Sequence, residues 1–349
     1  MSEATALVAT QDLAIHFVNA HGRGNVKAVD GVTLSVSRGE TFGIIGESGS
    51  GKSSLGRALV GLQKPSEGKV LHEGRDLFAL SRRDFARHRR DFPIIFQDAA
   101  TAMDPRMTIA QSVREPLDIA ATMAVAARDA RVAELLDAVG LSAEHGTRYP
   151  RTLSGGQNQR ATIARALALS PKLIVCDEVV APLDVSIQAD ILNLFARLQQ
   201  LLGLTYVFIT HDLGVVAHIS DRIAVMYLGK FVEVASAAAL MSKPLHPYTQ
   251  ALLSAEPDPA ATAAQRRQRI VLQGEIPSAT APPSGCRFRT RCWRATDQCA
   301  ASEPPLREIE RGRLVACHHV DGAALAGASS GAAPADKSSR ATGMAPASL

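Results

Sequence analysis

Short apolar runs alternate with longer stretches of helical periodicity over most of the chain. Residues 41–45, 173–176 and 206–209 are apolar runs, which are typical of strands buried on both faces of a parallel sheet. Between the last two runs, apolar residues recur at helical spacing, and Gly203 follows as a helix-ending residue. We therefore expect residues 1–255 to form an α/β domain with a mainly parallel sheet.

Three other segments depart from this alternation. Residues from about 98 to 150 look helical throughout and predict a helical subdomain inserted in the first domain. Residues 256–320 are rich in Pro, Arg and Cys and predict a small, loop-heavy extension. Residues 321–349 are mostly Ala, Gly, Ser and Pro without apolar periodicity, so we expect a disordered tail.

Composition and charge exclude several classes of protein. The 349 residues are 46% hydrophobic, which indicates a folded chain. The formal charge of +4, from 38 basic and 34 acidic residues, gives no reason to expect nucleic acid as a partner. No apolar run approaches the roughly 20 residues that span a bilayer, and the acidic start lacks the features of a signal peptide. We expect a cytosolic protein whose contact with a membrane is peripheral.

A phosphate-binding loop is predicted where the first apolar run ends. Residues 46–53 match the pattern G-x-x-x-x-G-K-S between a strand and a helix, and these neighbours disfavour a chance glycine-rich turn. Glycines let backbone N–H groups point at phosphate oxygens, while Lys52 would reach the β- and γ-phosphates and Ser53 would ligate Mg²⁺. The predicted nucleotide-binding residues are Gly46, Ser48, Gly49, Ser50, Gly51, Lys52, Ser53 and Ser54.

Two carboxylates, Asp177 and Glu178, follow the second apolar run. The carboxyl ends of parallel strands meet at one edge of the sheet, so this pair is expected beside the phosphate loop. Asp177 would hold Mg²⁺ through water, and Glu178 would polarise the attacking water. The alternative is an acidic pair facing solvent, which the phosphate loop disfavours.

Residues 153–157, Leu-Ser-Gly-Gly-Gln, resemble the signature motif of ABC ATPases. Ser-x-x-Gln is also a capping-box pattern, so an ordinary helix cap is the alternative. The paired glycines are poor helix formers and would instead let backbone amides approach an anion. The resemblance implies that this anion is the γ-phosphate of an ATP held by a second subunit, bound by Ser154, Gly155, Gly156 and Gln157.

The same resemblance implies roles for four more residues. Gln97 resembles the Q-loop glutamine that touches Mg²⁺ and the attacking water, and His211 resembles the switch histidine that contacts the γ-phosphate. Asp184 resembles the D-loop aspartate at the dimer interface. Phe17 stands where the family places an aromatic ring against adenine, although a core aromatic is an equal alternative.

Some positions depart from the family pattern. Val179 replaces the proline that normally follows the catalytic glutamate, Ala181-Pro182 replaces Ser-Ala in the D-loop, and Asp98-Ala99 lacks a proline after the Q-loop. All the catalytic side chains are present, so we still expect hydrolysis. The D-loop change leaves the turnover rate and the communication between subunits open.

Four segments narrow the class. They resemble ATPase subunits of dipeptide and oligopeptide importers and comprise residues 106–108, 183–188, 246–249 and 274–277. The resemblance implies a RecA-like P-loop core on the cytoplasmic face of the bacterial inner membrane. Its implied partners are a second ATPase, more often a different chain than a copy, two transmembrane permease subunits and a solute-binding protein.

Other substrates and other ABC proteins are the alternatives. Related subunits serve importers of nickel or other small solutes, so the substrate stays open. An ABC ATPase of DNA repair would need long heptad stretches between the two halves of its site, and a ribosome-acting ABC protein would carry two phosphate loops. The chain has neither feature.

Cys286, Cys292, Cys299 and Cys317 cluster near the C-terminus. Their spacings match neither zinc pairs nor ferredoxin runs, but clustering in a reducing compartment favours a metal over disulfides, with free thiols as the alternative. The resemblance implies a four-iron, four-sulfur cluster that crosslinks the extension, with zinc as the alternative. His318 and His319 could serve a zinc site, with plain surface residues as an equal alternative. Four nearby arginines would offset the thiolate charge: Arg287, Arg289, Arg291 and Arg294.

Overall fold

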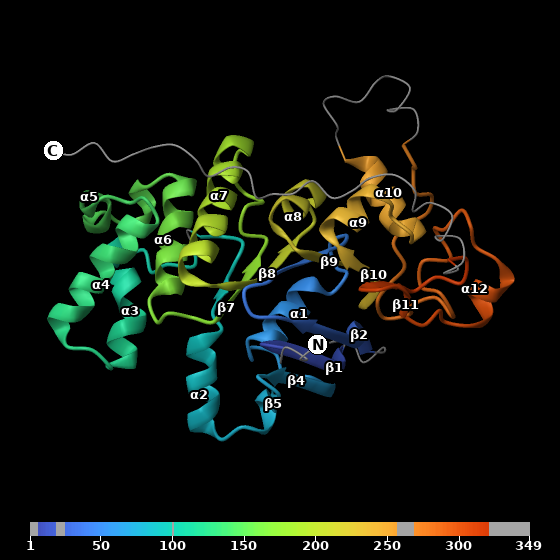
Figure 1. Cartoon of the computed structure of the whole chain (residues 1–349), viewed down its shortest axis with the longest axis horizontal. Coiled ribbons are helices and arrows are strands. Elements are labelled where there is room, and N and C mark those ends of the chain that lie inside the picture. Colours follow the sequence, from blue (N-terminus) through green and yellow to red (C-terminus); the bar gives the residue numbers. More distant parts are fainter. Residues whose placement is uncertain (1–5, 19–24, 100, 257–268, 321–349) are drawn as a thin grey trace.

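Two β-sheets form the body of the protein in a computed structural model that describes residues 6–18, 25–99, 101–256 and 269–320 (Figure 1). The predicted tail, 321–349, lies outside the described residues. The smaller sheet is antiparallel with the order β2-β1-β4-β5. Its strands are β1 (Val8–Val18), β2 (Asn25–Val36), β4 (Glu67–His72) and β5 (Arg75–Asp76).

The larger sheet has the order β11-β12-β10-β9-β3-β8-β7-β6. The five strands from β9 to β6 are parallel, and β10, β12 and β11 continue the sheet antiparallel. Its strands are β3 (Thr41–Ile45), β6 (Ile94–Ile95), β7 (Leu173–Asp177), β8 (Thr205–Thr210), β9 (Arg222–Tyr227), β10 (Lys230–Ser236), β11 (Arg307–Glu310) and β12 (Arg313–Val315). The prediction of an α/β domain with a mainly parallel sheet is confirmed.

Helices cover the sheets and form a separate layer at one end. The described helices are α1 (Lys52–Leu59), η1 (Leu77–Ala79), α2 (Arg82–Asp91), α3 (Ile109–Ala120), α4 (Val125–Ala138), α5 (Ala143–Thr147), η2 (Pro150–Thr152), α6 (Gly155–Leu167), α7 (Val185–Leu202), α8 (Leu213–Ile219), α9 (Ala237–Ser242), α10 (Pro247–Ala255) and α12 (Asp297–Ala301). None of these described helices is both long and apolar enough to cross a bilayer.

The three apolar runs form central strands because both of their faces are covered. Every residue of β3, β7 and β8 is buried, so their side chains pack on helices on either side. Between β7 and β8 runs α7, which buries Ile191, Phe195 and Leu198 and ends at Gly203 with φ 64°. This left-handed residue closes the helix as predicted.

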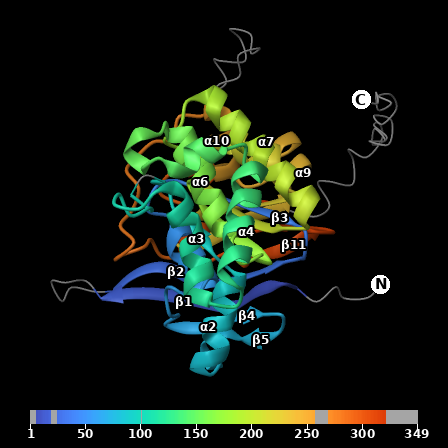
Figure 2. The same ribbon diagram turned by 90° about the vertical axis from the view of Figure 1, so that its left-hand side faces the viewer.

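The segment predicted to be helical carries α3, α4 and α5. Ile109, Val113 and Leu117 of α3 recur every four residues and share one apolar core with Val132 and Leu136 of α4. The signature helix α6 belongs to the same core, and Figure 2 shows α3, α4 and α6 together at the end of the molecule that faces the viewer. The helical layer therefore continues past residue 150, into the segment that carries the signature motif.

The extension shares its sheet with the ATPase core. The sequence predicted a loop-heavy segment, whereas β12 pairs with β10 and β11 pairs with β12. The two strands are short and rich in charged residues, which hid their alternation in the sequence. Phe288 is buried against Tyr227 and Tyr248, so the extension also shares an apolar core with the larger sheet.

Candidate nucleotide site

The phosphate loop joins β3 to α1 and approaches neighbouring backbone closely. Gly46 and Gly51 have φ values of 155° and 105°. A Cβ atom at Gly46 would lie 2.1 Å from the Met226 carbonyl oxygen, and one at Gly51 would lie 1.9 Å from the Ala28 carbonyl oxygen. Only glycine fits at these two positions.

Lys52 lies inside this loop. Its Nζ donates to the carbonyl oxygens of Gly46, at 2.7 Å, and Glu47, at 3.0 Å. Burial lowers the pKa of Lys52, while the carboxylates of Glu178, Asp177 and Glu47 oppose that shift. The Lys52 ammonium group thus lies among carboxylates and carbonyls, which favour its charged form against the effect of burial.

The two carboxylates at the end of β7 lie against the loop, as predicted. Ser53 Oγ donates to Asp177 Oδ1 at 2.9 Å. Burial is the main cause that raises the pKa of Asp177, and the bond from Ser53 opposes it. Glu178 has φ 54°, and its N–H donates to the Ile209 carbonyl at 2.8 Å. This kink turns Glu178 from the strand toward His211, whose Nδ1 lies 3.4 Å from Oε1.

A cavity of about 770 Å³ brings the predicted metal and catalytic residues together. Gln97, from the loop after β6, lines it with Ser53, Asp177 and Glu178. Hydroxyl, amide and carboxylate oxygens are the ligands that Mg²⁺ prefers, so the donor set fits this ion. His211, 57% exposed, stands beside Glu178.

The signature motif starts α6 with a complete helix cap. Ser154 Oγ accepts from the Gln157 N–H at 3.3 Å, and Gln157 Oε1 accepts from the Ser154 N–H at 3.0 Å. The capping box is therefore present, and it leaves Ser154 and Gly155 exposed. Gly156 is buried, and a Cβ there would lie 2.8 Å from Ile187 Cγ2, so close packing on α7 also requires this glycine.

Comparison with known proteins decides the family. Residues 29–181 match the ABC transporter family, and residues 232–299 match the C-terminal region of oligopeptide and dipeptide transporters. The chain is 51% identical over 313 residues to the putative oligopeptide transport ATP-binding protein YkfD of Bacillus subtilis, covering 89% of this chain and 95% of that one. The oligopeptide transport ATP-binding protein AppF of the same species is 48% identical, covering 84% and 90%.

The chain belongs to the oligopeptide and dipeptide family of ABC transporter ATP-binding subunits. A dimeric structure of the bacterial ABC transporter cassette MJ0796 is 30% identical, with a TM-score of 0.60, and covers 66% of this chain and 98% of that one. A structure of cbiO1 from Clostridium perfringens has a TM-score of 0.61 at 25% identity, covering 68% and 92%. The protein is thus an ATP-binding ABC transporter ATPase.

Phe17 and Asp184 are among the predicted residues of this ABC subunit that do not line the cavity. Phe17 lies on β1 and is 39% exposed, so its alternative interpretation as a core aromatic is wrong. Asp184 is exposed at the N-terminus of α7. Neither residue lines the cavity that holds Gln97 and Glu178.

The departures near the D-loop have local packing reasons. Val179 is 1% exposed and belongs to the apolar core that also contains the buried side chains of α6, the helix that begins with the signature motif. Gln188 Nε2 donates to the carbonyls of Val180, at 3.1 Å, and Leu183, at 3.0 Å. These bonds hold the D-loop of this ABC subunit in place around Ala181 and Pro182.

Sequence patterns did not predict two residues that lie around the phosphate loop. Arg57, on α1, lines the cavity and lowers the pKa of Asp177. Tyr248, on α10, accepts a hydrogen bond from the Glu47 N–H at 2.9 Å. Arg57 follows the Lys-Ser pair by one helical turn and was within reach of spacing arguments, whereas nothing in the sequence brings Tyr248 to the loop.

None of the five cysteines of this ABC subunit, all of which lie among the described residues, forms a disulfide. Burial, assisted by the other three cysteines of the extension, raises the pKa of Cys286 to about 11. Among the described residues, no group of three or more His, Cys, Asp or Glu side chains is arranged to hold a metal ion. His319 Nε2 lies 3.4 Å from Cys299 Sγ, while His318 Nε2 binds the Ser302 carbonyl at 3.0 Å.

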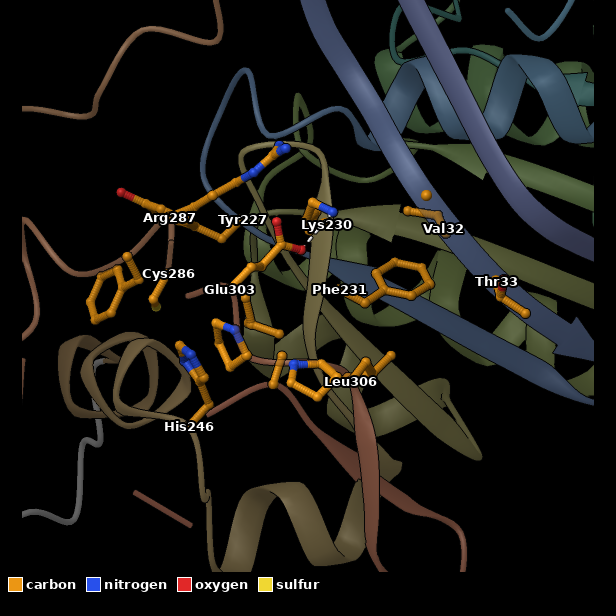
Figure 3. A pocket seen from close by; sticks show the side chains of 16 residues that line it. Val32, Thr33, Tyr227, Lys230, Phe231, His246, Cys286, Arg287, Glu303 and Leu306 are labelled. Carbon is orange, nitrogen blue, oxygen red and sulfur yellow. Dashed lines mark ion pairs between the residues drawn. The ribbon is translucent and has the colours of Figure 1, made fainter. Parts of the chain in front are cut away.

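The arginines of the extension have other partners than predicted. Arg294 alone of the four donates to a thiol, from its N–H to Cys292 Sγ at 3.4 Å. Arg289 binds Ser284, Arg287 pairs with Asp30, and Arg291 pairs with Glu47. Figure 3 shows the contact between the extension and the core, called the seam below, where Cys286 and Arg287 lie near residues of β10 and β2. The prediction that all four offset thiolate charge is wrong for Arg287 and Arg291, because the half-buried carboxylates of Asp30 and Glu47 are stronger partners than neutral thiols.

Proposed function

We propose that this ATPase powers the import of short peptides from the cytoplasmic face of a bacterial inner membrane. The observation that carries the proposal is the match of residues 232–299 to the C-terminal region of oligopeptide and dipeptide transporters. YkfD and AppF are both named as oligopeptide transport proteins, and their similarity extends over most of this chain. Two permease subunits and a solute-binding protein would complete the transporter.

The residues around the cavity support a mechanism for hydrolysis. The phosphate-loop amides and Lys52 would bind the phosphates, while Ser53, Gln97 and Asp177, which line the cavity together, would hold Mg²⁺. Bound Mg²⁺ would neutralise charge that develops on the β- and γ-phosphates. Glu178 orients the attacking water and accepts its proton, and His211, within 3.4 Å of Glu178, contacts the γ-phosphate.

The exposed signature motif supports a dimeric site. Ser154 and Gly155 face solvent at the start of α6, where the positive end of the helix would favour a phosphate of another subunit. Asp184 would lie at the same interface, and Phe17 would stack on adenine. Two ATPase subunits, more often different chains than copies, would then hold two ATPs between their phosphate loops and signature motifs.

Complementation tests this arrangement. In a homodimer, mixing Lys52→Ala chains with Ser154→Arg chains should restore part of the activity, because one composite site carries both defects and the other carries neither. Ser302→Arg, a matched change in the extension, should not reduce activity. In a heterodimer, the same variants are placed in this chain and its partner. Full hydrolysis by a diluted monomer would refute the sandwich.

We also propose a four-iron, four-sulfur cluster on Cys286, Cys292, Cys299 and Cys317. Zinc–sulfur bonds of about 2.3 Å would place four thiols about 3.8 Å apart, and the described thiols do not converge in this way. The cysteines of an iron–sulfur cluster bind different irons and can stand farther apart. The support for the proposal is that all four cysteines lie within the described part of one small extension, residues 269–320.

Purification without oxygen tests the cluster. The protein should be brown and contain iron and acid-labile sulfide. Cys292→Ser should lose the colour, while Cys176→Ala, in strand β7, should keep it. A colourless protein without iron or zinc, in which all four thiols of the extension titrate, would overturn the proposal.

A further inference from the structure

An arginine of the extension, Arg291, forms an ion pair with Glu47 of the phosphate loop. Arg291 Nη1 lies 2.6 Å from Glu47 Oε2, and Nη2 lies 3.0 Å from Oε1. The side chains are 8% and 25% exposed, so water screens the pair only in part. Two parallel bonds between planar groups fix orientation as well as distance. The pair therefore holds the second residue of the loop against a segment 244 residues farther along the chain.

The backbone of Glu47 continues this contact to Lys52. The Glu47 N–H donates to Tyr248 Oη at 2.9 Å. The Glu47 carbonyl accepts from the Ser50 N–H at 3.2 Å and from Lys52 Nζ at 3.0 Å. One residue, Glu47, thus connects the two cations: its side chain bonds the Arg291 guanidinium and its backbone carbonyl bonds the Lys52 ammonium group.

Arg291 is itself held in place by its neighbours in the extension and the core. Its N–H donates to the Phe288 carbonyl at 3.0 Å, and its guanidinium lies 6.0 Å from the ring centre of Tyr227. Phe288 is buried, with its ring centre 5.2 Å from that of Tyr227 and 5.3 Å from that of Tyr248. The extension therefore contributes a fixed cation to the loop, because aromatic packing leaves the arginine little freedom.

We propose that Arg291 is a positioning residue for ATP: it holds the phosphate loop through Glu47, so the cysteine-bearing extension sets the affinity for nucleotide. The inference rests on the assignment of residues 46–53 as the nucleotide site. Arg291 touches no phosphate in this scheme. It reduces the conformations open to the loop, and that entropy is otherwise lost when nucleotide binds.

The test measures the Kd for ATP and for ADP in the full-length protein by titration calorimetry. Arg291→Gln and Glu47→Gln should each weaken both nucleotides by about 3- to 10-fold, the range expected of coupled neighbours. The double variant should be no weaker than either single one, and Arg291→Lys should recover part of the loss. In the assembled transporter, KM for ATP should rise while kcat stays close to wild type.

Arg289→Gln is the matched control. Arg289 lies two residues away and its guanidinium bonds Ser284 within the extension, so the loss of that side chain should leave both affinities unchanged. Fluorescence of Trp293 reports whether the extension remains folded. Glu47→Gln approaches the pair from the loop, so it tests the role even if Arg291→Gln unfolds the extension.

The outcomes separate this role from the site assignment. Lys52→Ala should abolish binding; if that variant still binds ATP at wild-type affinity, the nucleotide site itself is wrongly assigned. If Lys52→Ala fails to bind while Arg291→Gln and Glu47→Gln bind normally, only the positioning role is overturned. Equal weakening by Arg289→Gln, or additive effects in the double variant, would also overturn it.

Discussion

The nucleotide site and the cysteine segment are held in place by different means. Strand ends and a helix start position the nucleotide site: β3 leads into the phosphate loop, and β7 delivers Asp177 and Glu178. In the extension, the strand β12 pairs with β10, but the cysteine segment, residues 286–299, lies outside that pairing and is held on the core by the ion pairs Arg287–Asp30 and Arg291–Glu47. The first arrangement is built from backbone pairing, and the second depends on a few ion pairs and buried rings.

This difference means that the two regions should fail in different ways. A side chain at the nucleotide site performs chemistry on a scaffold that does not need it, so its loss should reduce activity and spare the fold. A buried side chain at the seam of the extension supports the scaffold, so its loss should reduce stability first. Trp293, the one tryptophan of the chain, lies in the extension and reports its unfolding separately.

The largest effect is expected at Glu178. Glu178→Gln keeps the size of the side chain but removes the carboxylate, so phosphate release by the assembled transporter should fall by about 10² to 10⁴. ATP binding and the unfolding transition of Trp293 should be unchanged. Glu144→Gln, at an exposed helix position, should hydrolyse ATP normally. ATP hydrolysis at the wild-type rate by Glu178→Gln, or unfolding of that variant, would contradict the proposed difference between the nucleotide site and the extension.

A large loss of stability is expected at Glu233. This carboxylate is fully buried on β10, pairs with Arg313 at 3.2 Å, and accepts from the Leu245 and His246 N–H groups. Glu233→Gln leaves the arginine buried with a neutral partner, which should cost about 3–5 kcal/mol of unfolding free energy.

Urea unfolding followed by Trp293 fluorescence measures this loss. The exposed pair Glu144–Arg148 provides the control, since Glu144→Gln should not move the transition. The contrast would fail if Glu233→Gln unfolded like wild type while losing ATP hydrolysis.

A smaller effect is expected from pH at the same seam. Burial lowers the pKa of His246 to about 3 from an ordinary value near 6.5. Below pH 6.5, His246 binds a proton in the unfolded chain but not in the folded chain. The free energy of unfolding therefore keeps its full value above that pH and falls as the pH decreases below it. The contribution of His246 between pH 7 and pH 5 should be about 2 kcal/mol.

His246→Asn isolates this contribution. The histidine caps α10 by accepting from the Tyr248 N–H at 3.1 Å, and asparagine is a good cap without a titrating group. The variant should lose less stability than wild type between pH 7 and pH 5 in urea titrations. His72, whose pKa burial lowers to about 4, remains in both proteins and accounts for part of the residual slope. Identical slopes would contradict the assignment.

Local patterns predicted the fold and most of the nucleotide site. The strands at 41–45 and 173–177, the helix that ends at Gly203 and the juxtaposition of Ser53 with Asp177 all follow from neighbours in sequence or from parallel strand order. Local sequence patterns could not predict the contacts between segments that lie far apart along the chain. Nothing near Glu47 indicates that Arg291 or Tyr248 will meet it, because such contacts depend on the whole tertiary fold.

The extension shows the same limit. Arg287 and Arg291 stand beside cysteines in the sequence and were expected to face thiols, yet each bonds a carboxylate of the core. Residue spacing identifies which groups are near along the chain, but it does not give the direction in which their side chains point. The strands β11 and β12 were missed because four and three residues are too few to show alternation.

The pairing of β12 with β10 has a practical consequence for anyone who shortens this protein. A chain cut before residue 307 would leave one side of β10 with unsatisfied N–H and C=O groups. Open strand edges of this kind recruit other open edges, so such a fragment should associate and precipitate even though its phosphate loop is complete. A soluble short version would need charged residues or proline along that exposed border.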